Sequence, residues 1–106
     1  MSGEINVVAV LYPKPDKFDE VAALATQVIQ KVQAHEPDTL LYYSFRVKDK
    51  REIVMVERYK NHAAVQAHLQ TPYFKQFAAQ LPGLCAKPSE LRAGGFVGDW
   101  RGVSRL

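Results

Sequence analysis

Polar and apolar positions alternate in some stretches of this chain and recur every three to four residues in others, and these periods predict its elements. Alternate positions share one face in β-forming stretches such as residues 52–60, whereas residues 16–35 carry an apolar stripe with the period of a helix. A second helical pattern, in two short segments, follows the third strand. The predicted elements are a strand at 4–12, a helix at 16–35, strands at 39–47 and 52–60, helices at 61–69 and 71–84, and a strand at 88–97.

Residues that start or stop an element stand between these stretches. Asp16 is expected to cap the first helix, and Pro37 ends it because the residue before a proline avoids the helical conformation. Thr71 and Pro72 are expected to be the N-cap and the first residue of the last helix. Residues 48–51 form a short hairpin connection. These signals support the boundaries that the apolar periods indicate.

The order β-α-β-β-α-β is typical of the ferredoxin-like α+β fold, an antiparallel sheet with its helices on one face. A length of 106 residues fits one domain, residues 1–106, with a core at about 5–97 and a C-terminal tail at 98–106. A chain of this size buries roughly two-thirds of its unfolded surface, which allows one thin core. We therefore expect a single α+β domain.

Both faces of the predicted sheet are apolar, although the helices are expected to cover one of them. In the third strand Val54 and Val56 share one face, and Ile53 and Met55 share the other. The first strand is apolar on both sides, and the second carries tyrosines on both. An uncovered apolar face favours association, and in so short a chain its most economical cover is a second copy. The sequence thus predicts a homodimer through the sheet face.

Composition and charge argue against several classes of function. Hydrophobic residues make up 47% of the chain, which is typical of a globular protein. No apolar run reaches the roughly 18 residues needed to span a membrane. The net charge of +3 is scattered, and its densest group, in the turn at 48–51, is interpreted as solvated, so nucleic-acid binding is not expected. The first ten residues lack a basic signal region and lead directly into a strand.

Cysteine and histidine are too few to predict a disulfide or a metal centre. Cys85 is the single cysteine and is interpreted as an inert or partly buried thiol, with a reactive thiol as the alternative. The three histidines, His35, His62 and His68, do not form a motif typical of a metal site. We expect no metal, and a reducing, cytoplasmic location.

The most specific motif is VERYKNHAAVQAHLQTPYFKQF, residues 56–77. It resembles the signature of the antibiotic biosynthesis monooxygenase family, in which a Glu-x-Trp/Tyr strand end precedes an Ala-His-Leu-x-Thr/Ser-Pro-His/Tyr-Phe segment. The resemblance covers about residues 5–97 and implies a dimeric α+β barrel, in which two sheets pack face to face. It also implies chemistry without a cofactor, since characterised members include oxygenases that oxidise polyketide quinols and anthrones without flavin, metal or haem.

Three residues are candidates for that chemistry, each with a structural alternative. His68 is the first, as a base or anion stabiliser in an apolar pocket between helices and sheet; alternatively it bonds to the backbone or to a carboxylate such as Glu57. Glu57 lies on an apolar face and needs a partner such as His68 or an arginine, unless the strand end is exposed. Tyr73 is expected to place its phenol at the pocket mouth or to pack in the core. Three strand tyrosines are interpreted as core or dimer interface: Tyr42, Tyr43 and Tyr59.

The leading hypothesis is a cofactor-independent monooxygenase that oxidises a quinol, an anthrone or a similar small electron-rich aromatic substrate with O2. The alternatives are an isomerase, cyclase or decarboxylase of the same fold, and a non-catalytic dimeric binding or stress-associated module. The resemblance disfavours the haem-degrading relatives, because they need a tryptophan where this chain has His68 and a haem-ligating histidine where it has Ala78. Trp100 lies in the tail and matches neither position.

Overall fold

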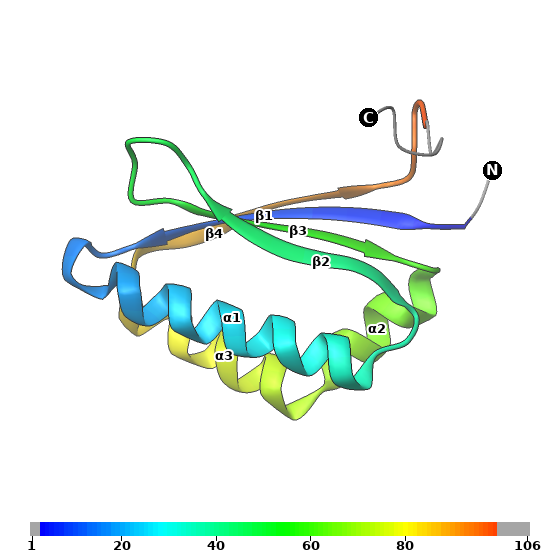
Figure 1. The fold of residues 1–106 in the computed structure, drawn as a ribbon, viewed down its shortest axis with the longest axis horizontal. Helices are drawn as coiled ribbons and strands as arrows, with labels where there is room; N and C mark the ends of the chain where they lie inside the picture. Colours follow the sequence, from blue (N-terminus) through cyan, green and yellow to red (C-terminus); the bar gives the residue numbers. More distant parts are fainter. Residues whose placement is uncertain (1–2, 100–106) are drawn as a thin grey trace, which may run out of the picture.

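The protein, described over residues 3–99 by a computed structural model, consists of one sheet with a layer of helices on one face (Figure 1). Its elements are β1 (Ile5–Pro13), a 3-10 turn (Pro15–Lys17), α1 (Phe18–His35), β2 (Thr39–Arg46), β3 (Ile53–Tyr59), α2 (His62–Gln70), α3 (Pro72–Leu84) and β4 (Cys85–Gly94). The sheet order is β2-β3-β1-β4, and neighbouring strands are antiparallel. Within the described range, no helix is long and apolar enough to cross a membrane. The predicted ferredoxin-like α+β fold is confirmed.

The start of the first long helix differs from the prediction. Asp16 is not its cap, because α1 begins at Phe18 and no side chain caps it. Asp16 lies instead inside the 3-10 turn that Pro15 starts. A proline suits the first position of a helical turn, since its φ is fixed and its missing N–H would have no partner there. The helical conformation therefore begins before the residue that the sequence pattern marks as a cap.

The last strand is also displaced from the predicted range of 88–97. It begins at Cys85, immediately after α3, because the final residues of β1 extend the pairing: Pro13 lies opposite Cys85, and Tyr12 lies opposite Lys87. Register shifts separate these pairs from the rest of the ladder, so the alternation that predicts a strand is interrupted there. The strand ends at Gly94, where a second glycine follows in the sequence.

Side-chain caps link β3, α2 and α3, and the one at Thr71 is as predicted. The side chain of Asn61 caps α2 by accepting a hydrogen bond from the backbone N–H of Ala64 at 2.9 Å. Thr71 caps α3 by accepting from the N–H of Phe74 at 3.4 Å, and its hydroxyl donates to the carbonyl of His68 at 2.8 Å. Thr71 therefore satisfies backbone groups at the end of one helix and the start of the next. These bonds place His68 in the last turn of α2.

The core lies between the sheet and the helices. Inward-facing residues of β1 and β3 pack against the apolar stripe of α1 and against one phenylalanine of α3. This stripe is the one that the helical period of residues 16–35 predicts. The buried members of the core are Ala9, Leu11, Val21, Ala25, Val28, Val32, Ile53, Met55, Phe77 and Cys85.

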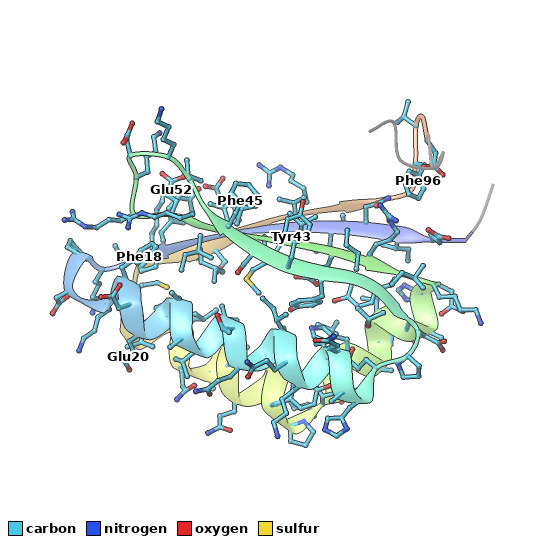
Figure 2. The ribbon with its side chains drawn as sticks, in the orientation of Figure 1. Phe18, Glu20, Tyr43, Phe45, Glu52 and Phe96 are labelled. Carbon is cyan, nitrogen blue, oxygen red and sulfur yellow. The ribbon has the colours of Figure 1, made fainter. Side chains whose placement is uncertain are left out.

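The other face of the sheet has no helix over it (Figures 1 and 2). Val8, Tyr43 and Phe45 are 37%, 45% and 48% exposed, and Figure 2 shows Phe45 on the side away from the helices. Arg58 lies on the same strand as inward-facing Glu57 but one position along, so it points to this outer face. Its Nε atom is buried and has no hydrogen-bond partner among the residues described. The apolar character of both faces is confirmed, and the homodimer stays a prediction.

Candidate functional site

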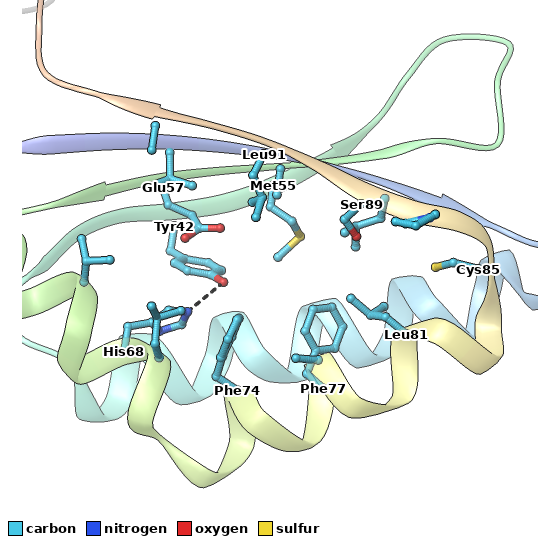
Figure 3. A pocket seen from close by; sticks show the side chains of 18 of the residues that line it. Tyr42, Met55, Glu57, His68, Phe74, Phe77, Leu81, Cys85, Ser89 and Leu91 are labelled. Atoms are coloured by element: carbon cyan, nitrogen blue, oxygen red, sulfur yellow. Dashed lines mark hydrogen bonds between the residues drawn. The ribbon is translucent and has the colours of Figure 1, made fainter.

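A cavity of about 690 Å³ lies between the inner face of the sheet and helices α2 and α3 (Figure 3). Its walls are mainly apolar: Phe74 and Phe77 of α3 lie on one side, and Met55 of β3 lies across from them. Leu91, on the edge strand β4, also lines it and is 62% exposed, so the cavity is open at that edge. A volume in this range is typical of pockets that bind small organic ligands. The predicted apolar pocket between helices and sheet is therefore present.

The end of the cavity next to α2 is polar. His68, Glu57, Tyr42 and Tyr59 line it together, and Figure 3 shows the first three facing one another across the gap between sheet and helix. His68 is 1% exposed and Glu57 is 8% exposed. Because buried titratable groups are unfavourable without partners, the hydrogen bonds of these residues decide what chemistry this end can perform.

His68 has a hydrogen-bond partner on each side of its ring. Nδ1 lies 3.0 Å from both carboxylate oxygens of Glu36, and Nε2 lies 3.4 Å from the hydroxyl oxygen of Tyr42. The ring also packs against Phe74, with 4.6 Å between ring centroids. A carboxylate can only accept, so Nδ1 carries a proton, and in the neutral ring Nε2 presents its lone pair toward Tyr42. The predicted carboxylate partner exists, but it is Glu36 and not Glu57.

Glu36 is the functional residue that the sequence reasoning missed. It is the C-cap residue of α1, and its side chain is 9% exposed. Besides His68, it accepts hydrogen bonds from the hydroxyl of Thr39, at 3.0 Å, and from the hydroxyl of Tyr73. In the sequence it is visible only as part of the helix stop before Pro37. Its partner His68 is 32 residues away along the chain, so no local signal points to the pair.

Glu57 is bonded to a tyrosine, and the predicted direct pairing with His68 or an arginine is wrong. The hydroxyl of Tyr59 donates to it, and Tyr42 lies opposite it on the neighbouring strand β2. Burial raises the pKa of Glu57, and this effect exceeds the lowering by the Tyr59 hydrogen bond. A buried carboxyl group with a raised pKa on a cavity wall is a candidate for proton exchange with a ligand.

Tyr42 and Tyr59 contribute hydroxyl groups that the sequence interpretation did not use. Burial and the nearby carboxylate of Glu57 raise the pKa of both phenols well above their usual range, so each keeps its proton. Tyr42 has one proton and two acceptors in reach, Nε2 of His68 and the carboxylate of Glu57. One of these acceptors is therefore open to a ligand whichever bond Tyr42 makes.

Of the two places predicted for Tyr73, the pocket mouth and the core, the structure shows the core, since Tyr73 does not line the cavity. It packs against the core from α3, and its hydroxyl donates to Glu36. Burial, followed by the hydrogen bond to Glu36, raises the pKa of Tyr73 to about 12. The phenol of Tyr73 thus stays protonated and donates to Glu36, and Tyr73 can influence the cavity only through Glu36.

The opposite end of the cavity holds Cys85, where α3 passes into β4 (Figure 3). Burial raises the pKa of its thiol, which disfavours the reactive thiolate and supports the interpretation of Cys85 as inert. Among residues 3–99, no group of three or more histidine, cysteine, aspartate or glutamate side chains is placed to hold a metal ion. Trp100 lies outside the described residues.

Fold and site together define a class of protein: a small ferredoxin-like α+β domain whose helix-covered sheet face holds an apolar cavity with a buried histidine–carboxylate pair at one end. Comparison with known families identifies the class. The family model for antibiotic biosynthesis monooxygenase matches residues 4–80. The chain belongs to this family, as the motif at residues 56–77 predicted.

Individual relatives match most of this chain. "Uncharacterized protein sll1783" from Synechocystis is 37% identical over 74% of this chain, and the match spans 54%, about half, of that relative's length. "Putative monooxygenase Rv0793" from Mycobacterium tuberculosis is 28% identical over 83% of this chain and 86% of its own length.

Solved structures agree on the fold. The structure of Rv0793 superposes with a TM-score of 0.86 at 24% identity, over 91% of this chain and 97% of that one. The structure of "a putative antibiotic biosynthesis monooxygenase" from Caulobacter crescentus has a TM-score of 0.85 at 30% identity, over 92% of each chain. The α+β arrangement is thus shared with proteins of the family over nearly the whole described range.

Proposed function

We propose that this protein is a cofactor-independent monooxygenase that oxidises a quinol, an anthrone or a similar electron-rich aromatic with O2. One observation carries the proposal: an apolar cavity of about 690 Å³ ends at Nε2 of His68, whose other ring nitrogen lies 3.0 Å from the carboxylate of Glu36. Membership of the antibiotic biosynthesis monooxygenase family supports the same class of reaction.

The cavity suits a flat, largely apolar substrate with one polar end. A ring system placed between Phe77 and Met55 would replace water along apolar walls. Its hydroxyl or keto group would then point to the polar end, toward His68 and Glu57. In such a site the protein contributes by positioning the substrate, favouring its anion and excluding water.

The proposed reaction of an anthrone consumes one molecule of O2, converts the ring methylene group to a ketone and releases one molecule of water. Nε2 of His68 removes the acidic proton of the substrate, and the resulting anion transfers an electron to O2. Recombination of the two radicals forms a C–O bond, and the imidazolium returns its proton to the peroxide. Loss of the second C–H proton then cleaves the O–O bond, which leaves the ketone and water.

Glu57 and Tyr73 take different parts in this scheme. Because burial raises the pKa of Glu57, its protonated form can donate a hydrogen bond to the substrate oxygen as negative charge develops there. Tyr73 touches Glu36 and not the cavity, so it supports the position of the His68–Glu36 pair. His68 and Glu57 are therefore the proposed catalytic groups, and Tyr73 is a positioning residue.

Oxygen uptake with a panel of hydroquinones and anthrones, in the presence of a chelator and without added flavin, tests the proposal. We expect uptake with stoichiometric ketone or hydroxyquinone, and a loss of roughly 10²- to 10⁴-fold in kcat for the general-base variant His68→Gln. His62→Gln, an exposed histidine on the same helix, is the matched control and should keep full activity. Absence of uptake with every compound, or full activity in His68→Gln, would refute the proposal.

A proton-transfer enzyme of the same fold, an isomerase, cyclase or decarboxylase, is the second candidate. Two titratable side chains, His68 and Glu57, face one cavity, and the Tyr42 hydroxyl lies 3.4 Å from Nε2 of His68, which is an arrangement that can move a proton without O2. Turnover of a keto–enol substrate that is unchanged under strictly anaerobic conditions would favour this candidate over the oxygenase.

We also propose that the protein is a homodimer in which a second copy covers the outer sheet face. Val8, Tyr43 and Phe45 leave apolar surface exposed there, and the buried Nε of Arg58 has no acceptor within the described part of the chain. Sedimentation velocity at micromolar concentration should give a dimer, and Phe45→Lys should shift it toward monomer. A wild-type protein that sediments as a stable monomer would contradict the proposal.

A further inference from the structure

Glu36 accepts hydrogen bonds from side chains of three separate elements. Its carboxylate accepts from Thr39 at the start of β2, from His68 in the last turn of α2 and from Tyr73 in the first turn of α3. Glu36 itself is the residue that ends α1. The carboxylate does not line the cavity, so it cannot touch a substrate bound there. Any influence on the reaction must pass through one of these three side chains.

The contact with His68 differs in kind from the other two. Both carboxylate oxygens lie 3.0 Å from Nδ1, and the imidazole and carboxylate side chains are 2% and 9% exposed. In such a buried place a carboxylate stabilises the cationic form of a ring that has gained a proton. It also determines which nitrogen carries the proton in the neutral ring, because it offers acceptors alone.

We propose that Glu36 is a positioning residue for His68: it holds the imidazole with Nδ1–H directed away from the cavity, keeps Nε2 free as the proton acceptor, and stabilises the imidazolium formed when a substrate proton is taken. This inference rests on the proposed function of His68 as the base. It adds a residue that does not belong to the sequence motif and does not reach the substrate.

The alternative arrangement of the ring shows what Glu36 prevents. Tyr42 and Glu57 lie on the Nε2 side, and both offer acceptor oxygens. Without Glu36, an Nδ1 proton would be left without its partner in a buried site, so the tautomer protonated at Nε2 would be favoured, with its N–H directed at those oxygens. The lone pair would then lie on the wrong side of the ring for a substrate in the cavity.

Steady-state kinetics of Glu36→Gln test the charge while keeping the size of the side chain. We expect kcat to fall by about 10-fold or more, because the imidazolium loses its anionic partner, with KM nearly unchanged because Glu36 does not touch the cavity. The low-pH limb of the kcat/KM profile should move to lower pH. Glu20→Gln, the same substitution at an exposed carboxylate of α1, is the matched control. It should change kcat by less than about 2-fold and should not move the pH profile.

A double-mutant cycle separates positioning from a general effect on folding. If Glu36 acts through His68, then adding Glu36→Gln to His68→Gln should cause no further loss of kcat. A further loss equal to that in the wild-type background, or an equal loss in Glu20→Gln, would overturn the inference. So would a Glu36→Gln variant with wild-type kcat, and in that case the oxygenase proposal itself would stand.

Nitrogen-15 NMR of histidine-labelled protein tests the same inference without turnover. The neutral ring of His68 should show a protonated Nδ1 and an unprotonated Nε2, and Glu36→Leu should shift the pattern toward Nε2–H, with His62 unchanged as the internal control. A wild-type His68 protonated at Nε2 would overturn the inference. If His68 is protonated at Nδ1 as expected but the protein oxidises none of the substrates, the positioning role would be supported and the oxygenase proposal would be refuted.

Discussion

The stability of the protein should depend on pH in part through the carboxyl group of Glu57. Burial raises the pKa of Glu57 above its ordinary value of 4.5, so the folded protein holds a proton there at pH values where the unfolded chain has released it. For an acid whose folded-state pKa is raised, the stabilising contribution is fully present below the unfolded pKa. It is lost as the pH rises through the folded pKa. The contribution of Glu57 to the free energy of unfolding of the wild-type protein should therefore decrease as the pH rises above about 4.5.

The variant Glu57→Gln isolates this effect. The amide has nearly the same shape, can still accept from Tyr59 and does not titrate in this range. Each pKa unit of elevation corresponds to about 1.4 kcal/mol, which is also the steepest possible change per pH unit for one proton. Against a total stability of about 5–15 kcal/mol for a domain of this kind, the difference is large enough to measure by denaturant unfolding.

Urea unfolding followed by circular dichroism, at intervals between pH 4 and pH 8, provides the comparison. The free energy of unfolding of Glu57→Gln minus that of wild type should increase with pH and then level off above the folded pKa. Glu20→Gln, an exposed carboxylate on α1, is the control and should follow the wild-type curve. A difference that is flat, or that decreases with pH, would refute the inference that burial governs the protonation of Glu57.

Two further substitutions test neighbouring parts of the structure. Tyr59→Phe removes a hydroxyl that lowers the pKa of Glu57. It should therefore reduce the free energy of unfolding more at pH 7 than at pH 4 in the same assay, and an equal reduction at both pH values would contradict this. Thr71→Ala removes the cap of α3 and the bond to the carbonyl of His68, and should lower the free energy of unfolding by about 0.5–2 kcal/mol. A Thr71→Ala variant as stable as wild type would show that the junction does not depend on this cap.

The elements and the family were readable from the sequence because their signals are local. The caps at Asn61 and Thr71 act within three residues, and the alternation in β3 assigns Glu57 and Tyr59 to the inner face without knowledge of any other strand. The same reasoning failed at Asp16, where a proline moved the helical turn ahead of the expected cap, and at the start of β4, where register shifts interrupt the alternation.

Part of the candidate site could be predicted from the sequence. The motif singled out His68, and the need of Glu57 for a partner followed from its place on an apolar face. The identity of those partners did not follow, because the contacts of His68 with Tyr42 and Glu36 join residues 26 and 32 positions apart. For Tyr73 the sequence left the pocket mouth and the core as alternatives, and its direction from α3 places it against the core with its hydroxyl on Glu36.

The order of strands and helices, the two apolar faces of the sheet, the membership of the family and the choice of His68 all followed from the amino-acid sequence. These depend on side-chain periods of two and 3.6 residues and on caps, which the chain carries at short range. Only the packing of the folded chain brings Glu36, at the end of α1, to His68 and places the Tyr42 hydroxyl 3.4 Å from Nε2 of His68. The packing of α1 against α3 and β2 sets those distances, and a buried polar group takes whatever partner that packing brings within reach.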